Sequence, residues 1–427
     1  MRPCRRPRIA RPAAEVFAWH ERPGALARLC PPWENVEVVS ATGGVRDGAR
    51  VVVRNRRGPF TMEWTVEHRG YVAGREFRDV QLSGPFAEWE HVHRVEADGP
   101  DAALLTDDIS YRVPGGAAGR IVAGGFVRRE LARLFAWRHA VTKADLETAA
   151  RYDSSPRVVL VAGASGLLGS ALVGFLQTQG HRVLRLVRRE PMGPDEIRWD
   201  PARGELSPTA LSGVDAVVNL SGENVGAGRW TAARREAILR SRVDATRTLV
   251  AAMKAAGRPP GVLVSASAVG FYGERGDEVL PETASIGQGF LPEVCLAWET
   301  HADVAARAGG RTVLLRFGVV LTPAGGALAK MLPPREAGEP LVRWAARIAP
   351  LMAGLTISNN LSTFRCLSCS NRGANAIRPL DLASIVFGSL MLKIGESGSS
   401  RAFLLRNFPA SEKSCIRKIR VIFLCLR

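Results

Sequence analysis

The sequence lacks the features that would place it in a membrane or in a disulfide-stabilised secreted class. Its 427 residues contain no unbroken apolar stretch long enough for a membrane helix. The seven cysteines are scattered and odd in number, which argues against a disulfide framework. The N-terminal segment is basic, but no apolar core follows it, so it does not resemble a secretory signal. We therefore expect a globular cytoplasmic protein.

Signatures of nucleic-acid binding and of zinc sites are missing as well. The formal net charge is +17, but residues 335–427 contribute +9 of it, with 14 basic and 5 acidic residues. The remaining chain is mixed in sign, so we expect no nucleic-acid partner. Cys366 and Cys369 form a CxxC pair, but no second pair or histidine pair completes a zinc set. We interpret this pair as fortuitous.

The first block, residues 1–150, alternates apolar and polar residues in segments that Gly and Pro separate. Alternation of this kind predicts strands. A longer stretch, about 126–146, repeats apolar residues at helical spacing and predicts a closing helix. Several strands with one long helix predict an α+β domain whose sheet wraps that helix. The predicted strands are 50–54, 61–66, 89–95 and 102–111.

The second block, residues 156–334, follows a polar link that ends in Pro156. Its apolar runs are continuous rather than alternating, and stretches of helical length separate them. This pattern predicts an α/β Rossmann-like doubly wound parallel sheet with helices on both faces. The predicted strands are 158–162, 183–187, 216–220, 262–265 and 312–315.

A glycine-rich loop follows the first of these strands and predicts a dinucleotide site. Gly163 would permit a sharp turn, Gly166 would let the backbone approach a pyrophosphate, and Gly169 would let a helix pack closely on the sheet. That helix, about 167–179 and capped by Gly180, would present its amino end to the pyrophosphate. The predicted cofactor-binding residues of the loop are Gly163, Ser165, Gly166, Leu167 and Gly169.

Two arginines, Arg188 and Arg189, end the second strand. An acidic residue at this place would bind the ribose hydroxyls of NAD. Guanidinium groups suit a 2′-phosphate instead, and the alternative is a solvated surface pair. We predict that NADP is the cofactor.

Several further segments of this block follow a family pattern. They are 161–169, 215–222, 229–230, 241–247, 264–273, 315–321 and 325–332. Together they resemble the atypical, sugar-nucleotide epimerase-like branch of the extended short-chain dehydrogenases/reductases, the NAD-dependent epimerase/dehydratase family. The resemblance implies that Asn219, Ser221 and Gly222 line the cofactor cleft. It also implies that Ser267 hydrogen-bonds the reacting oxygen and that Tyr272 belongs to the active site; the alternative for each residue is packing or a turn.

The resemblance breaks at the acid–base pair. The superfamily uses a Tyr whose pKa is lowered by a Lys four residues later, on the same helical face. The matching helix here carries Leu291 and Cys295. Neither can take these parts, so the usual epimerase chemistry is in doubt. Glu223, Glu293 or Tyr272 could substitute, and the sequence does not select among them.

The first block carries a second family pattern, in segments 17–20, 22–24, 31–33, 77–79, 84–91, 108–111, 135–139 and 145–146. It resembles the START-like helix-grip proteins of the polyketide cyclase/dehydrase (SRPBCC) type. Such domains enclose an apolar cavity between sheet and long helix, which suits a hydrophobic ligand. Trp89, His91 and His93 share one strand face and could line that cavity or bind a metal. Because no third ligand is evident, we interpret them as a polar or half-buried strand face and predict no metal site.

The third block, residues 335–427, shifts in composition toward Ser, Asn, Ile and Cys, without a sustained helical or strand period. We expect a frameshift or a foreign fusion after about Pro334. In that case the last strands of the second domain and part of its substrate cleft would be missing.

These patterns together predict an NADP-dependent oxidoreductase or epimerase-like enzyme. It would transfer hydride at a carbonyl or nucleotide-sugar-like carbon, with Ser267 polarising the oxygen. Two alternatives stay open: a non-catalytic NADP-responsive binding protein, and a hydrophobic-ligand binder or cyclase that acts through the first domain. The expected partners are small molecules, and neither nucleic acid nor a membrane is expected.

Overall fold

The computed structural model describes residues 6–57, 60–152, 155–276, 278–307, 309–326 and 365–367. The chain divides into two compact units. The first comprises residues 1–155 with 174–180, and the second comprises the rest. The frameshift or fusion expected after Pro334 concerns residues outside the described ones, apart from the short strand β15 (Arg365–Leu367).

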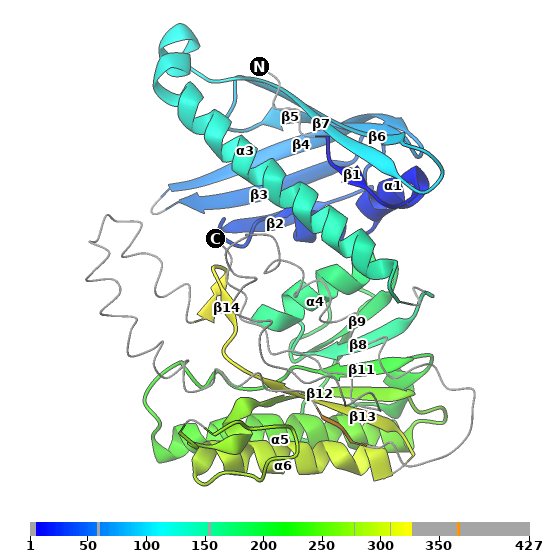
Figure 1. The fold of residues 1–427 in the computed structure, drawn as a ribbon, viewed down its shortest axis with the longest axis vertical. Coiled ribbons are helices and arrows are strands. Elements are labelled where there is room, and N and C mark those ends of the chain that lie inside the picture. Colours follow the sequence, from blue (N-terminus) through cyan, green and yellow to red (C-terminus); the bar gives the residue numbers. More distant parts are fainter. Residues whose placement is uncertain are drawn as a thin grey trace. The chain divides into compact units, whose positions relative to one another are not determined.

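The first unit is a seven-stranded antiparallel sheet with one long helix (Figure 1). The strand order is β1–β7–β6–β5–β4–β3–β2, so the last six strands form a meander in which chain neighbours pair. The elements are β1 (Arg8–Ile9), α1 (Ala13–Glu21), α2 (Ala25–Leu29), β2 (Val36–Ala41), β3 (Arg50–Arg57), β4 (Phe60–Val72), β5 (Glu76–Ser83), β6 (Glu88–Ala97), β7 (Ala103–Arg112) and α3 (Gly116–Ala149).

Helix α3 crosses this sheet diagonally in Figure 1. Its apolar residues Leu131 and Phe135 pack with Trp89 and Ile109 of the sheet in one buried cluster. Their spacing of four residues places both on the same helical face. The α+β helix-grip prediction is therefore confirmed, although α3 begins ten residues earlier than the periodicity indicated.

The second unit is a mostly parallel sheet in the order β10–β9–β8–β11–β12–β13–β15, in which only β15 pairs antiparallel. The Rossmann-like doubly wound prediction is confirmed. The elements are β8 (Val158–Ala162), α4 (Leu167–Thr178), β9 (Arg182–Val187), β10 (Glu196–Arg198), η1 (Pro208–Leu211), β11 (Ala216–Asn219), α5 (Ala232–Ala255), β12 (Val262–Ala268), η2 (Val269–Tyr272), α6 (Phe290–Arg307), β13 (Arg311–Phe317) and β14 (Leu321–Thr322).

The order of the strands reverses between β8 and β11. From β8 the chain adds β9 and β10 on one side and then returns to add β11, β12 and β13 on the other. Doubly wound sheets bind ligands at the carboxyl ends of the strands beside such a reversal. The loops that follow β8 and β11 are therefore the place to look for a site.

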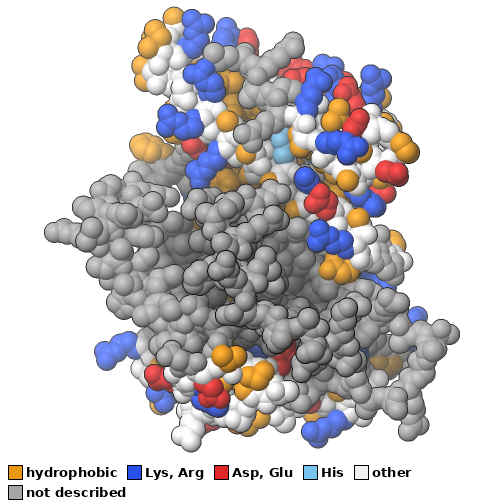
Figure 2. Space-filling view, in the orientation of Figure 1, with side chains coloured by type: hydrophobic (Ala, Val, Ile, Leu, Met, Phe, Trp, Pro, Cys, Tyr) orange, Lys and Arg blue, Asp and Glu red, His pale blue; other side chains and the backbone are white. Residues whose placement is uncertain are grey.

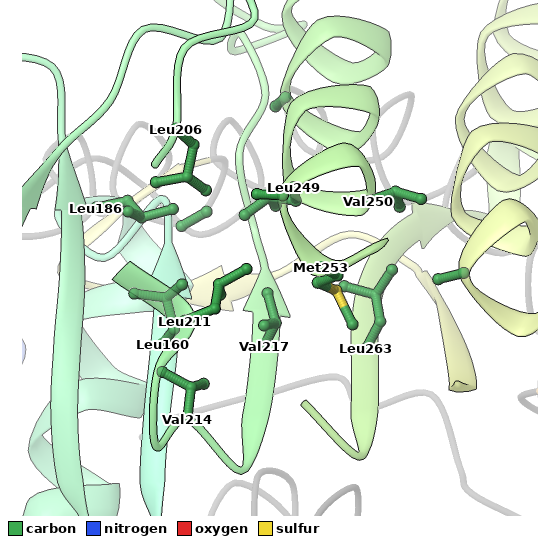
Figure 3. Close-up of a cluster of buried hydrophobic side chains, with 14 of the residues drawn as sticks. Leu160, Leu186, Leu206, Leu211, Val214, Val217, Leu249, Val250, Met253 and Leu263 are labelled. Carbon is green, nitrogen blue, oxygen red and sulfur yellow. The ribbon is translucent and has the colours of Figure 1, made fainter. Parts of the chain in front are cut away.

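A buried cluster between the sheet and α5 holds the second unit together (Figure 3). Leu160, Val217 and Leu263 come from three neighbouring strands and pack with Leu249 and Met253 of α5. Burying each leucine fully contributes about 1.5–3 kcal/mol to folding. Residues on the other side of the same strands, such as Val159 and Val161, are also fully buried, so both faces of the sheet are covered.

No helix among the described residues combines the length and apolar character needed to cross a bilayer. On the face seen in Figure 2, Lys and Arg side chains are interspersed with acidic and apolar ones. The side chains visible there thus do not form one uninterrupted basic patch.

Candidate functional site

The loop between β8 and α4 has backbone geometry that only glycine permits at two positions. Gly163 has φ +78°, and a Cβ on it would lie 2.7 Å from the carbonyl carbon of Leu220. A Cβ on Gly169 would lie 2.1 Å from the carbonyl oxygen of Gly163. Because backbone atoms cause both clashes, the sharp turn and the close helix both require glycine.

Gly166 occupies a different environment. A Cβ on it would meet only the Gly163 carbonyl oxygen, at 3.3 Å, besides its chain neighbours. Ser165, Gly166 and Leu167 are exposed at the amino end of α4. The fold itself leaves room for a side chain at position 166. A pyrophosphate that approaches the first amides of α4 would require glycine there. The loop therefore fits a dinucleotide.

The turn after β11 completes this edge of the sheet. Asn219 is fully buried, and its amide nitrogen donates to Thr246 Oγ1 at 2.9 Å and to Ser265 Oγ at 3.4 Å. Its side-chain oxygen accepts from the Ser221 amide at 3.2 Å. Asn219 thus holds the turn in place. Ser221 and Gly222 follow it beside the glycine loop, half-buried and exposed respectively.

The two arginines after β9 have different surroundings. Arg189 clamps Glu196 of β10 with Nη1–Oε2 at 2.7 Å and Nη2–Oε1 at 2.8 Å. These bonds, with a further one from the Met192 amide, lower the pKa of Glu196 to about 2. Arg188 is exposed, and its guanidinium has no hydrogen-bond or ion-pair partner in the part of the chain that the structure describes. Arg188 is therefore the arginine that is available to an anion.

Ser267 and Tyr272 are joined by a buried network through two residues that the sequence analysis missed. Ser267 Oγ donates to Glu299 Oε1 at 2.6 Å. Arg316 donates to Glu299 Oε1 and Oε2, at 2.7 Å each, and to Tyr272 Oη at 2.9 Å. We call these four residues the Ser267–Tyr272 network; none is more than 6% exposed. A glutamate on the apolar face of α6 and an arginine inside an apolar strand were the signals that could have revealed it.

The hydrogen bonds of the network decide where its protons point. Burial disfavours the Arg316 cation, but the bonds to Glu299 outweigh this and raise the pKa of Arg316 above its usual value. Burial also raises the pKa of Tyr272, against the opposite effect of Arg316. The Ser267 hydroxyl donates to Glu299, whereas the Tyr272 oxygen accepts from Arg316.

The positions of the missing acid–base pair hold Leu291, which has no proton to transfer, and Cys295, whose Sγ donates to the Ala268 carbonyl oxygen at 3.7 Å. A Cβ on Gly270 would lie 3.3 Å from Leu291 Cβ and 3.9 Å from Cys295 Sγ. Burial raises the pKa of the Cys295 thiol to about 11, so it stays neutral near pH 7. The alternative carboxylates lie elsewhere: Glu293 is exposed, and Glu223 pairs with Arg234 at 2.9 Å. Neither is hydrogen-bonded to the Ser267–Tyr272 network.

The first unit contains a cavity of about 410 Å³ beside β3–β6, α1 and α2. The predicted ligand cavity is thus present, with apolar walls that include Val53, Trp64 and Val66. The interpretation of the histidine strand as half-buried is wrong, because His91 and His93 are 1% and 5% exposed and line this cavity. The reason is that neighbouring strands supply carboxylates to them, among which Asp79 is a potential third metal ligand.

Both carboxylates beside these histidines are held ionised. Burial would raise the pKa of Asp79 and of Asp107, but contacts with the surrounding histidines, His93 above all for Asp79 and His139 for Asp107, hold each pKa well below its usual value. Burial and the neighbouring His93 lower the pKa of His20 to about 4, so His20 is neutral near pH 7. Part of the cavity wall is therefore charged.

Comparison with known proteins agrees with this architecture. The model of the NAD dependent epimerase/dehydratase family matches residues 159–292, and that of polyketide cyclase / dehydrase and lipid transport matches residues 9–140. The crystal structure of the nucleoside-diphosphate sugar epimerase from Corynebacterium glutamicum is 34% identical, with a TM-score of 0.65, over 78% of this chain and 70% of that one. The chain belongs to the NAD-dependent epimerase/dehydratase family.

Curated members of the epimerase family match part of the chain. An epimerase family protein of Mycobacterium bovis is 48% identical over 41% of this chain and 58% of its own length. The human epimerase family protein SDR39U1 is 37% identical over 42% of this chain and 60% of its own length. The chain thus spans somewhat under two thirds of these relatives. Its first unit is a polyketide cyclase/dehydrase domain, as the resemblance predicted.

The contrast between the loop glycines gives a first prediction. Gly166→Ala should change the free energy of unfolding by no more than about 0.5 kcal/mol, because its Cβ meets only one atom. Gly169→Ala should cost about 1–3 kcal/mol, because the helix must move off the sheet. Urea unfolding checks both values. Although Gly166→Ala should leave the fold intact, it should weaken dinucleotide binding. Equal destabilisation by the two substitutions would contradict this account.

The Ser267–Tyr272 network gives a second prediction. Glu299→Gln leaves the buried Arg316 without a counter-charge and should cost about 3–5 kcal/mol of unfolding free energy. The matched control is Glu236→Gln, which breaks an exposed pair with Arg240 and should cost no more than about 1 kcal/mol. Urea unfolding of both variants tests this. Similar costs for the two would show that the buried pair does not stabilise the second unit.

Proposed function

We propose that the chain is an NADP-dependent oxidoreductase of the epimerase type, acting by hydride transfer on a carbonyl or nucleotide-sugar-like substrate. The observation that carries the proposal is Arg188, which is exposed and has no hydrogen-bond or ion-pair partner among the described residues, on the same edge of the sheet as the exposed glycine loop. Ala162 of β8 pairs with Leu186 of β9, so the glycine loop and Arg188 both emerge at the carboxyl edge of the sheet. A 2′-phosphate and a pyrophosphate of one dinucleotide suit these two features.

The substrate class rests on the relatives. The Corynebacterium glutamicum protein is a nucleoside-diphosphate sugar epimerase by name, and it aligns with most of this chain. We carry that class over as a proposal for this chain.

Tyr272 is the better candidate for the proton-transfer step than Ser267. The dinucleotide, when bound, supplies or accepts the hydride. The protein must then give a proton to the oxygen that gains charge. Arg316 donates to the Tyr272 oxygen, which leaves the phenol proton free, while Ser267 already donates to Glu299. In this proposal Ser267 orients Glu299, and the role of polarising the substrate oxygen passes to Tyr272.

A non-catalytic NADP-responsive binding protein is a second candidate. It is favoured by Leu291 and by the buried, neutral Cys295 at the positions where the acid–base pair would stand. NADPH binding without turnover of any carbonyl compound or nucleotide sugar would support it, and turnover would exclude it.

A third candidate places the activity in the first unit, as a small-molecule binder or cyclase. The cavity of about 410 Å³ and its apolar walls favour it. Binding of an apolar fluorescent probe to the full chain, with no NADPH binding, would select this candidate over the first two.

Arg188 provides the test of the cofactor. Arg188→Ala should weaken NADPH binding about 10- to 100-fold, because one hydrogen bond to the charged 2′-phosphate is lost. NADH binding should stay unchanged, because NADH has no 2′-phosphate. Tryptophan-fluorescence titration with both dinucleotides measures this. The control is Arg198→Ala, a nearby exposed arginine that pairs with Glu190 and should alter neither affinity. An unchanged preference in Arg188→Ala would refute the assignment of NADP.

Tyr272 provides the test of the chemistry. Tyr272→Phe keeps the ring but removes the proton donor, so turnover with a panel of carbonyl compounds and nucleotide sugars should fall about 100-fold or more. NADPH affinity should stay as in the wild type. Tyr71→Phe, which removes a hydroxyl bound to Glu21 in the first unit, is the matched control and should not change turnover. Undiminished turnover in Tyr272→Phe would exclude this role.

A further inference from the structure

Five of the chain's seven histidines lie together in the first unit, and all are buried. They are His20, His68, His91, His93 and His139. Asp79 of β5 and Asp107 of β7 flank β6, which carries two of them. Histidines and carboxylates of this number inside one small domain are costly to bury, so they call for a function beyond packing.

Three of these side chains converge on one point. Asp79 Oδ2 lies 3.4 Å from His91 Nδ1 and 3.2 Å from His93 Nε2. Ligand atoms from all three lie within 4.8 Å of one another. Donors that share an ion at bond lengths of about 2.0–2.2 Å are themselves separated by roughly 3.0–3.5 Å. Both separations from Asp79 Oδ2 have this size, and the one to His93 Nε2 is a hydrogen bond in the structure.

A further side chain contacts each of Asp79, His91 and His93 on the side that faces away from the other two. Asp107 Oδ1 lies 2.8 Å from His91 Nε2 and 3.0 Å from His93 Nδ1, the ring nitrogens that do not face Asp79. The other oxygen of Asp79 lies 2.8 Å from His68 Nδ1. Metal-binding histidines in proteins typically have their second nitrogen fixed by a carboxylate in this way. Asp107 is fixed in turn by His139, which contacts its other oxygen.

The charges of the site also suit a cation. Asp107 is buried and Asp79 is half-buried, and both carboxylates contact His93, whose pKa they raise to about 9 despite its burial. A divalent ion would take the place of the proton on His93 and leave both imidazoles in the neutral form that binds metals.

We propose that Asp79, His91 and His93 bind a divalent transition-metal ion whose remaining coordination positions face the cavity of the first unit. All three residues line that cavity of about 410 Å³. Two histidines and one carboxylate with open positions form the ligand set of metal sites that bind a small molecule or water directly. The ion therefore gives this domain a Lewis-acidic anchor for an oxygen or nitrogen atom of a ligand.

The experiment uses the full chain, stripped with a chelator, dialysed and then titrated with Co²⁺ and Zn²⁺ in the absence of dinucleotide. We expect one ion per chain, and for Co²⁺ the visible absorption of an ion with nitrogen and oxygen ligands. His91→Ala and Asp79→Asn should abolish this absorption. Asp107→Asn should weaken binding about 10- to 100-fold, as loss of a group behind a ligand does. His20→Ala, which removes a cavity histidine bonded to the Val16 carbonyl, is the matched control and should bind normally.

The cysteine pair supplies the outcome that would overturn the proposal. A thiolate-to-cobalt charge-transfer band, lost in Cys366→Ser, would place the ion at the CxxC pair instead. Absence of binding by the wild-type chain would overturn the proposal as well. Circular dichroism of each variant separates loss of a ligand from loss of fold, and the wild-type spectrum decides the ligand type even where a variant fails to fold. Since no dinucleotide is present, the result is independent of the proposed NADP-dependent activity.

Discussion

The close approach of two turns at the reversal of the parallel sheet governs the second unit. The Leu220 carbonyl group lies so near Gly163 that no side chain fits between them. Asn219 holds the Leu220 turn through two hydroxyls and one amide, so this turn has little freedom to retreat. This contact requires glycine at position 163 and thereby fixes how the chain turns from β8 into α4. Packing between the two turns thus helps to position the amino end of α4 at the carboxyl edge of the sheet.

Each unit buries a charged network where an apolar core would be more stable. In the second unit, Glu299 and Arg316 form a two-point ion pair between α6 and β13. In the first unit, Asp79 and Asp107 lie among five histidines. Burying an ion costs several kcal/mol even after pairing, and apolar residues of similar size commonly replace such pairs without loss of stability. Such placements are typical of functional sites, and both networks lie beside the features that favour ligand binding.

Alternation along the chain predicted β6 even though His91 and His93 face inward, because Trp89 and Val95 keep the apolar period on that side. Strand 158–162 was predicted at its observed bounds, because Val159, Leu160 and Val161 are buried and no polar residue interrupts them. Strand β5 was missed because Asp79 faces inward, where the alternation requires an apolar residue. The start of α3 was missed for the opposite reason: Ile121 and Val122 are exposed, so no apolar stripe marks that part of the helix.

The residues of the candidate site also fall into two groups, those that local patterns predicted and those that they did not. The glycine loop could be predicted because its residues are contiguous and each has a separate steric task. Glu299, Arg316 and Asp79 were missed, since the contacts that single each of them out are made with partners far away in the sequence. Their roles depend on which strands the fold makes neighbours: β5 beside β6, and β13 beside β12. Asp79 alone turns two histidines of one strand into a three-ligand set, and no spacing along the chain encodes it.

The polar part of the cavity wall changes what the first unit can bind. His68, Asp79, His91 and His93 face the cavity, and each already has a partner among the neighbouring His and Asp side chains. An occupant that is apolar throughout would still remove the remaining water from these charged groups without forming a hydrogen bond to them, which offsets part of the gain from the apolar walls. A purely polar occupant would in turn bury little apolar surface against the apolar walls, which include Val53, Trp64 and Val66. The cavity is therefore matched to a molecule with an apolar body and a polar end directed at Asp79 and the two histidines.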